Sequence, residues 1–172
     1  MYKILTIDGK DYKLEYNVEA ALYKNGIDRL IEFLGGTFGA QEGKEIVNGL
    51  PEKEKVETMQ KLILNLKNEM TNLPNTALEL FYMGLLEHHG PDGDGSILTM
   101  KDAKHLVSKL FAEQPEDGIC DFATLLSMCT DQMGEDGFFK RTGLEKILAQ
   151  STVEKPNRAT RRANTRQSGT KS

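Results

Sequence analysis

The start of the chain carries two short runs suited to β-strands, separated by the dipeptide Asp8-Gly9. Asp-Gly tolerates the positive φ angles of a tight two-residue turn. Apolar and charged side chains alternate in the second run: Tyr12, Lys13, Leu14, Glu15 and Tyr16. The pattern predicts a β-hairpin over residues 1–16. Because two strands alone are only marginally stable in water, this hairpin must pack on helices or join a neighbour's sheet.

Residues 17–150 carry helical signals. Asn17 is a suitable N-cap for a first helix, which we expect to be interrupted near Asn25-Gly26 and to end at Gly35-Gly36. The weakly patterned, glycine-containing residues 37–50 predict a loop with a short helical turn.

The strongest helical pattern begins at Pro51. Apolar residues recur there at helical spacing: Val56, Met59, Leu62, Ile63, Leu66 and Met70. Leu73-Pro74 predicts the end of this helix, because proline lacks an N–H and clashes with the preceding turn. Residues 76–88 predict a separate helix that is apolar nearly all round, and such a helix lies in a core or at an interface.

The remaining helices are marked by turns and caps. Gly90–Ser96 is rich in turn residues, and Glu135-Asp136-Gly137 predicts another turn. Thr99 with Asp102 has the spacing of a cap, and Thr142 with Glu145 that of a capping box. The apolar stripes of the three helices concerned are Ala103, Leu106, Val107, Leu110 and Phe111, then Phe122, Leu125, Leu126, Cys129 and Met133, then Leu144, Ile147 and Leu148.

Together these elements predict an α+β protein, predominantly helical, with an N-terminal β-hairpin followed by five or six helices. We expect a single domain over residues 1–152, with the hairpin in 1–16 and the helices in 17–150. Residues 153–172 contain too few apolar side chains to order themselves and predict a disordered basic tail. The charged residues after position 154 are all basic: Lys155, Arg158, Arg161, Arg162, Arg166 and Lys171. Since the whole chain has a formal net charge of −4, its acidic excess lies before the tail.

The sequence predicts no contact with a membrane. No apolar run approaches the roughly 20 residues needed to span a bilayer. The start, Met1-Tyr2-Lys3-Ile4, lacks the apolar region of a secretory signal, so we expect the protein to stay in the compartment where it is made. Cys120 and Cys129 would lie about 13 Å apart along a helix, which is too far for a disulfide. We predict two buried, reduced thiols.

A short segment, Asp92–Ile97, resembles the middle of an EF-hand calcium loop. The first and last ligand positions of such a loop would fall on Gly90 and Lys101, where aspartate and glutamate are needed. A simple turn between helices is therefore the preferred interpretation, and we expect no metal and no cofactor. The alternative is calcium held by Asp92, Asp94 and Ser96.

No constellation of catalytic residues stands out. The chain lacks a nucleophile elbow, and Gly35-Gly36 is not followed by the Lys-Ser/Thr of a phosphate-binding loop. We therefore predict no enzymatic activity and no catalytic residues. The tail lacks aromatic rings for base stacking, and the acidic body repels nucleic acid. One interpretation of the tail is a solubilising disordered end; the other is that its arginines bind an acidic protein surface.

Several segments resemble tail assembly chaperones of long-tailed phages and prophages of Gram-positive bacteria. The segments are 7–12, 14–23, 86–95, 128–139 and 157–163. The resemblance implies a chaperone that binds the tape measure protein, a very long helical chain, and keeps it soluble while tail tube subunits polymerise around it. It also implies that the chaperone leaves before the virion matures, acts in the host cytoplasm, and has the tail tube protein as a further candidate partner.

Two further expectations concern partners. The exposed edge of the hairpin predicts self-association, because an unpaired edge strand can pair with another copy. Client binding needs apolar surface, although core packing is the other interpretation of helix 76–88. The candidate partner-binding residues are Phe81, Met83, Leu85, Leu86, Arg158, Arg161 and Arg162. The alternative function is that of an EF-hand-like regulatory or calcium-binding protein.

Overall fold

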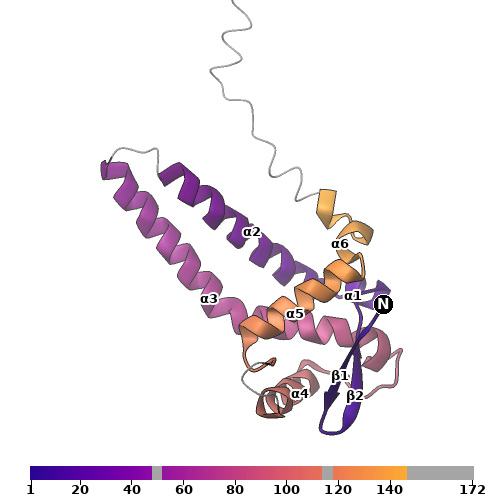
Figure 1. Ribbon diagram of the computed structural model, residues 1–172. Coiled ribbons are helices and arrows are strands. Elements are labelled where there is room, and N and C mark those ends of the chain that lie inside the picture. Colours follow the sequence, from indigo (N-terminus) through magenta and orange to yellow (C-terminus); the bar gives the residue numbers. More distant parts are fainter. Residues whose placement is uncertain (48–51, 114–117, 147–172) are drawn as a thin grey trace, which may run out of the picture. The chain divides into compact units, whose positions relative to one another are not determined.

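A computed structural model of the protein describes residues 1–47, 52–113 and 118–146, with the side chains of all but residues 36–47, 52–66 and 69. The described part is α+β and predominantly helical, which confirms the predicted class (Figure 1). Its elements are β1 (Lys3–Ile7), β2 (Lys10–Leu14), α1 (Val18–Leu22), α2 (Lys24–Val47), α3 (Glu52–His89), α4 (Met100–Glu113), α5 (Phe122–Glu135) and α6 (Phe138–Arg141). The chain divides into two units, Met1–Phe138 and Phe139–Ser172, and the predicted boundary lies between residues 152 and 153.

The predicted hairpin is confirmed. β1 and β2 pair antiparallel, with Leu5 opposite Tyr12 and Ile7 opposite Lys10. Asp8 and Gly9 have φ angles of 54° and 71°, as a type I′ turn requires. The N–H of Glu15 donates to the carbonyl of Gly84 in α3 at 2.9 Å. The hairpin therefore packs on the helices, which is the first of the two arrangements that its small size allows.

The long helix α3 is the centre of the first unit. It contacts α1, α2, α4, α5 and β2. Most of its side chains from Thr76 to Leu86 are buried, and those without exposed surface are Ala77, Leu80, Phe81, Met83 and Leu85. Each large apolar side chain buried in this way contributes about 1.5–3 kcal/mol. The second half of α3 is apolar all round because neighbours surround it on every side.

The predicted loop over residues 37–50 is wrong as far as residue 47. α2 runs without a break from Lys24 to Val47, so Gly35-Gly36 lies inside the helix rather than at its end. The first helix is interrupted at Tyr23, which has extended φ and ψ angles of −79° and 90°. Gly35 and Gly36 alone make the helix about 2 kcal/mol less stable than two alanines would. Packing of α2 along α3 outweighs this local cost.

The predicted helix end at Leu73-Pro74 is also wrong. α3 is a single helix of 38 residues with Pro74 inside it. A proline in this position removes one hydrogen bond and bends the helix. Figure 1 shows α3 changing direction part-way along its length. Pro74 lines one pocket with residues of α4 and α5, so tertiary packing surrounds this weak point.

Capping residues mark the starts of several helices, and one of these caps was predicted from the sequence. The N–H of Thr99 donates to Asp102 at 2.8 Å, and the N–H of Asp102 donates to the Thr99 hydroxyl at 3.3 Å, so the predicted cap of α4 is confirmed. Asp121 and Thr124 form a capping box at the start of α5 that was not predicted from the sequence. Asn17 is the N-cap residue of α1, but its side chain makes no capping hydrogen bond.

The described part of the second unit is short. Thr142 lies in a turn, its hydroxyl donates to the carbonyl of Phe139 at 3.4 Å, and Leu144 begins a further helical stretch. Gly143 has a φ angle of 77°. Ile147 and Leu148, predicted for the last helix, lie outside the described residues.

Candidate functional site

The candidate partner-binding residues of helix 76–88 lie in the core. Phe81, Met83 and Leu85 have no exposed surface, and Leu86 is 9% exposed. They offer a partner no accessible surface in this fold, so the expectation that they contact one is corrected. The apolar pattern around this helix reflects its central place among α1, α2, α4, α5 and β2.

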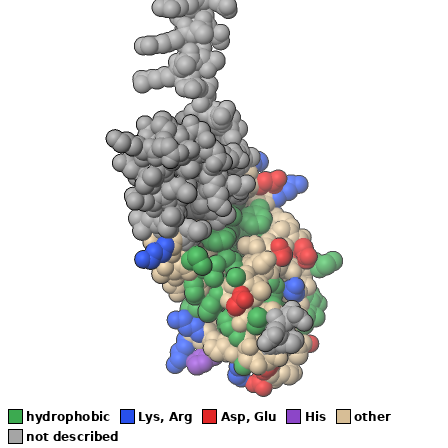
Figure 2. All heavy atoms as spheres, turned by 60° about the vertical axis from the view of Figure 1, so that its left-hand side comes forward, with side chains coloured by type: hydrophobic (Ala, Val, Ile, Leu, Met, Phe, Trp, Pro, Cys, Tyr) green, Lys and Arg blue, Asp and Glu red, His purple; other side chains and the backbone are tan. Residues whose placement is uncertain are grey.

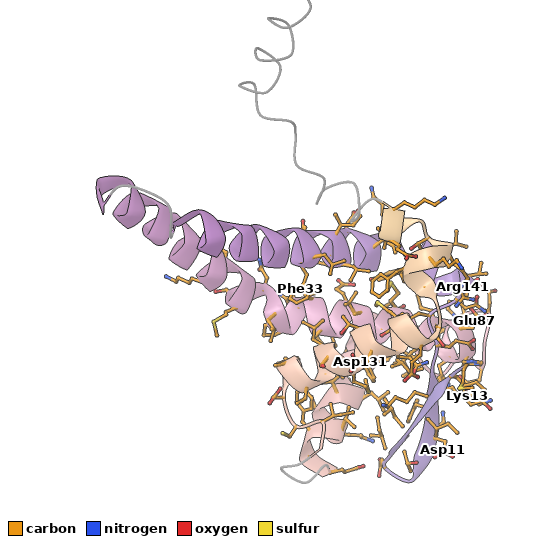
Figure 3. The ribbon with its side chains drawn as sticks, turned by 45° about the horizontal axis from the view of Figure 1, so that its top comes forward. Asp11, Lys13, Phe33, Glu87, Asp131 and Arg141 are labelled. Atoms are coloured by element: carbon orange, nitrogen blue, oxygen red, sulfur yellow. The ribbon has the colours of Figure 1, made fainter. Side chains whose placement is uncertain are left out.

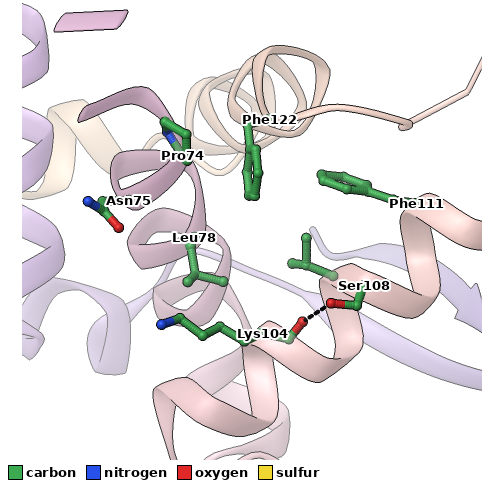
Figure 4. A pocket seen from close by; sticks show the side chains of 8 residues that line it. Pro74, Asn75, Leu78, Lys104, Ser108, Phe111 and Phe122 are labelled. Carbon is green, nitrogen blue, oxygen red and sulfur yellow. Dashed lines mark hydrogen bonds between the residues drawn. The ribbon is translucent and has the colours of Figure 1, made fainter. Parts of the chain in front are cut away.

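An open apolar pocket lies between α3, α4 and α5 (Figure 4). Its volume is about 280 Å³. The residues that line it are Pro74, Asn75, Leu78, Lys104, Val107, Ser108, Phe111 and Phe122. Small-molecule sites usually enclose roughly 300–1,000 Å³. A pocket of this size can take one protruding apolar side chain of another protein.

Two phenylalanine rings form one wall of the pocket. Phe111 lies in the last turn of α4 and Phe122 begins α5, and their ring centroids lie 5.1 Å apart with an interplanar angle of 79°. This edge-to-face contact is the favoured geometry of an aromatic pair. Both rings are only half-buried, whereas Leu78 and Val107 are buried beneath them. The pocket therefore has a buried aliphatic floor and aromatic sides that a partner can reach.

The polar lining of the pocket is small. The hydroxyl of Ser108 donates to the carbonyl of Lys104 at 3.0 Å, so it is used within α4 (Figure 4). Asn75 and Lys104 are the remaining polar side chains of the lining, and both are exposed. The lining therefore suits the burial of an apolar group, and the side chain of Lys104 adds one positive charge at the rim of the pocket.

The sequence pattern does not reveal this pocket. Val107 and Phe111 belong to the apolar stripe of one predicted helix, Phe122 belongs to that of the next, and Pro74 was predicted to end a helix. The one sequence feature that could have indicated the pocket is that Phe111 and Phe122 lie close to the two ends of the segment that connects α4 to α5. Side chains at helix ends have fewer neighbours to cover them, but the distance between the rings depends on the tertiary fold.

The segment proposed as an alternative calcium site is a closed turn between α3 and α4. The amides of Gly93 and Gly95 both donate to the carbonyl of Gly90 at 3.1 Å. Asp94 accepts the N–H of Ser96 at 2.9 Å through one carboxylate oxygen, and the other oxygen lies 2.9 Å from Nδ1 of His89. Hydrogen bonds from Ser96 and then from His89 lower the pKa of Asp94 to about 2. Asp94 is thus engaged in holding a turn that links α3 to α4.

His89 connects this turn to the hairpin. Its Nε2 accepts the N–H of Lys13 at 2.9 Å, which places the ring hydrogen on Nδ1, facing Asp94. The imidazole is buried and stacks at a tilt on Tyr12, with centroids 5.3 Å apart. Figure 3 shows Lys13 on β2 and Glu87 on the last turns of α3 at the same end of the unit. The role of His89 here is to join three segments of the chain.

Asp136 forms a second buried polar centre, and its side chain has no exposed surface. It accepts hydrogen bonds from the N–H of Tyr16 at 2.8 Å, from Gln132 at 2.9 Å and from the amino group of Met1 at 3.1 Å. Tyr16 in turn donates its hydroxyl to the carbonyl of Leu80 at 3.0 Å. Burial raises the pKa of Tyr16 well above its usual value. These bonds tie the start of the chain to α3 and α5.

The two cysteines differ in their surroundings. Cys129 is buried and Cys120 is exposed, and neither is in a disulfide. Burial raises the pKa of the Cys129 thiol to about 12. The prediction of two buried thiols is therefore right for Cys129 and wrong for Cys120, because Cys120 precedes α5 instead of lying within it.

Other predicted sites have separate outcomes. Arg158, Arg161 and Arg162 lie outside the described residues. Within 1–47, 52–113 and 118–146, no three His, Cys, Asp or Glu side chains are grouped so that they could hold a metal ion. In the same part of the chain, no helix combines the length and apolar character that crossing a membrane requires.

Comparisons of the chain with protein-family models, with curated proteins and with solved structures found no match.

Proposed function

We propose that this protein is a binding protein without catalytic activity, a tail assembly chaperone that holds the tape measure protein of a long-tailed phage or prophage. It keeps this long helical client soluble in the host cytoplasm during assembly of the tail tube and is absent from the finished virion. The resemblance of several segments to this class of chaperone is one support for the proposal.

The observation that carries the proposal is the open apolar pocket between α3, α4 and α5. A chaperone of amphipathic helices must offer accessible apolar surface on a folded body. Phe111 and Phe122 provide such a surface, over a floor formed by the buried Leu78 and Val107 (Figure 4). The titratable groups with the best-defined hydrogen bonds, such as Asp94 and Asp102, serve to close turns and to cap helices.

Self-association is part of the proposal, since coating a long client requires many copies. Exposed apolar side chains lie on and after the hairpin, namely Ile4, Val18 and Leu22, which are 52%, 60% and 72% exposed. We expect sedimentation velocity to show oligomers that grow with concentration. A strict monomer at high concentration would remove this part of the proposal.

Co-expression tests the central claim. We expect the long helical protein of the same tail gene cluster to become soluble when expressed with this chain and to co-purify with it. An unrelated acidic helical protein of similar size is the control. If the client is equally soluble with the control protein, the proposed function is wrong.

A further inference from the structure

We propose that the pocket binds an apolar side chain of an acidic amphipathic helix, and that Lys101 and Lys104 contact the acidic residues beside that side chain. The proposal rests on the proposed function, because it names the chemistry of the client segment that this chain would hold.

The exposed charges on α4 beside the pocket are positive, which favours an acidic partner. Lys104 lines the pocket and Lys101 lies one turn before it, and both are exposed. Residues three and four apart share one face of a helix, so these lysines form a stripe with Ser108 and Phe111. Neither lysine forms an ion pair with another described residue. Lys104 at the pocket, and Lys101 one turn away on the same helix, are thus positive charges available to a partner.

The acidic residues of α4 are engaged elsewhere. Asp102 caps the helix by accepting the N–H of Thr99 at 2.8 Å. Glu113 accepts the N–H of Asp8 in the hairpin turn at 2.9 Å. The face of α4 that borders the pocket therefore carries lysines without acidic residues, and its charge is opposite to the net charge of the chain.

The preceding part of α3 continues this surface. Met70 is 69% exposed and lies about one turn before Pro74, and the exposed Lys67 lies about one turn earlier on the same face. From residue 67 to residue 78 this face extends about 16 Å along the helix. Figure 2 shows apolar side chains gathered in the middle of one face, with basic side chains along one side of them and acidic side chains among them and on the other side. A helix laid along such a face gains apolar burial at its centre and opposite charges at its edge.

Charge also argues against the chain's own tail as the occupant. The charged residues from 155 to 172 are all basic, so the lysines of α4 would repel them. An acidic amphipathic helix satisfies both the apolar pocket and its lysines.

Two synthetic peptides provide the probes. Both are amphipathic helices with the same apolar stripe and one central tryptophan, but one has an acidic polar face and the other a basic polar face. Because the chain contains no tryptophan, the fluorescence of this residue reports only on the peptide. We expect the emission of the acidic peptide to shift to shorter wavelength and to saturate as the full chain is added, whereas the basic peptide binds at least about tenfold more weakly.

Two variants test the residues. Lys101→Glu/Lys104→Glu should weaken binding of the acidic peptide by about tenfold, as expected for the loss of two exposed ion pairs, and should strengthen binding of the basic peptide. Ser108→Leu should fill the mouth of the pocket and weaken both peptides by about tenfold. Lys24→Glu and Ser127→Leu make similar changes at exposed positions that do not line the pocket, and should leave binding unchanged. Thermal melting confirms that each variant is folded.

The outcomes separate this inference from the proposed function. If the chain keeps the tape measure protein soluble, but the lysine and Ser108 variants bind and solubilise it as well as the native chain does, the inference is overturned and the function stands. If the acidic peptide binds in the expected way and the client is not solubilised, the inference stands and the function is wrong. If Ser108→Leu dissociates oligomers of the chain and leaves peptide binding unchanged, the occupant is a second copy and the inference is overturned.

Discussion

Gly84 shows how a single missing side chain lets the hairpin reach α3. A Cβ atom at this position would lie 2.6 Å from Cδ1 of Leu14 and 2.8 Å from Cζ of Tyr16. Helix propensity favours alanine over glycine by about 1 kcal/mol, but these contacts lie well inside van der Waals distance. We expect Gly84→Ala to lower the free energy of unfolding by about 1–3 kcal/mol, measured by denaturant titration.

Gly134 is the matched control for this prediction, because it lies in α5 and a Cβ atom there meets nothing within 4 Å. Gly134→Ala should raise the free energy of unfolding by up to about 1 kcal/mol. If both alanines stabilise the protein, the close approach of the hairpin to α3 is not a constraint on the fold.

The two thiols should react at different rates. Cys120 is exposed, whereas burial raises the pKa of Cys129 to about 12, so Cys129 has almost no thiolate at pH 8. We expect one fast equivalent with a disulfide reagent in the native protein and a second only after denaturation. Cys120→Ser should remove the fast phase, and a fast phase that persists in this variant would contradict the assignment.

At the scale of elements, short sequence motifs correctly predicted the turns and caps that are formed by neighbouring residues. Asp8-Gly9 identified the hairpin turn, and the pair of Thr99 and Asp102 identified a helix start, because a turn or cap is made by neighbours in sequence. Gly35-Gly36 and Pro74 were interpreted as helix ends for the same kind of reason. They are not ends because packing between α2, α3, α4 and α5 is decided by residues far apart in sequence.

Pro74 makes α3 weaker than its length suggests. Pro74→Ala restores an N–H that can donate to the carbonyl of Met70, and an alanine is favoured over a proline by up to about 3 kcal/mol inside a helix. We expect the variant to have a higher melting temperature, with a gain in free energy below that limit because the neighbours of α3 have adapted to the bend. A lower melting temperature would show that the packing of α4 and α5 depends on the bend itself.

At the scale of the molecule, acid should destabilise the fold. The aspartates whose pKa values are lowered in the folded state are Asp8, Asp94, Asp102 and Asp121. The main causes are Lys109 for Asp8 and hydrogen bonds within turns or caps for the other three. Since a lowered pKa means preferential binding of protons by the unfolded chain, the stabilisation is present above the ordinary value of 3.8 and is lost as the pH falls towards about 2. Solvent exposure keeps each contribution small.

Thermal unfolding between pH 5 and pH 2 tests this expectation. The melting temperature should fall mainly below about pH 4. Asp121→Asn is the sharpest variant, because asparagine also caps a helix but does not titrate, so its melting temperature should fall less steeply with pH. Equal slopes for the variant and the native chain would assign the acid sensitivity to other groups.

The candidate site was less predictable than the fold. A pattern of apolar residues identifies a helix face, but it does not say whether that face is covered. Phe81 and Phe111 both belong to apolar stripes, and only the arrangement of neighbours buries the first and leaves the second half-exposed. The pocket therefore results from the packing of helices that are far apart in sequence, and a pattern in one sequence does not reveal that packing.

The position of α3 at the centre of the first unit also determines how that unit can come apart. Because one helix touches α1, α2, α4, α5 and β2, detaching any of them uncovers a side of the same helix. We therefore expect residues 76–89 to hold the slowest-exchanging amide hydrogens, released only by global unfolding. Cooperative unfolding of this unit then depends on one segment of α3, and the elements around it unfold together with it.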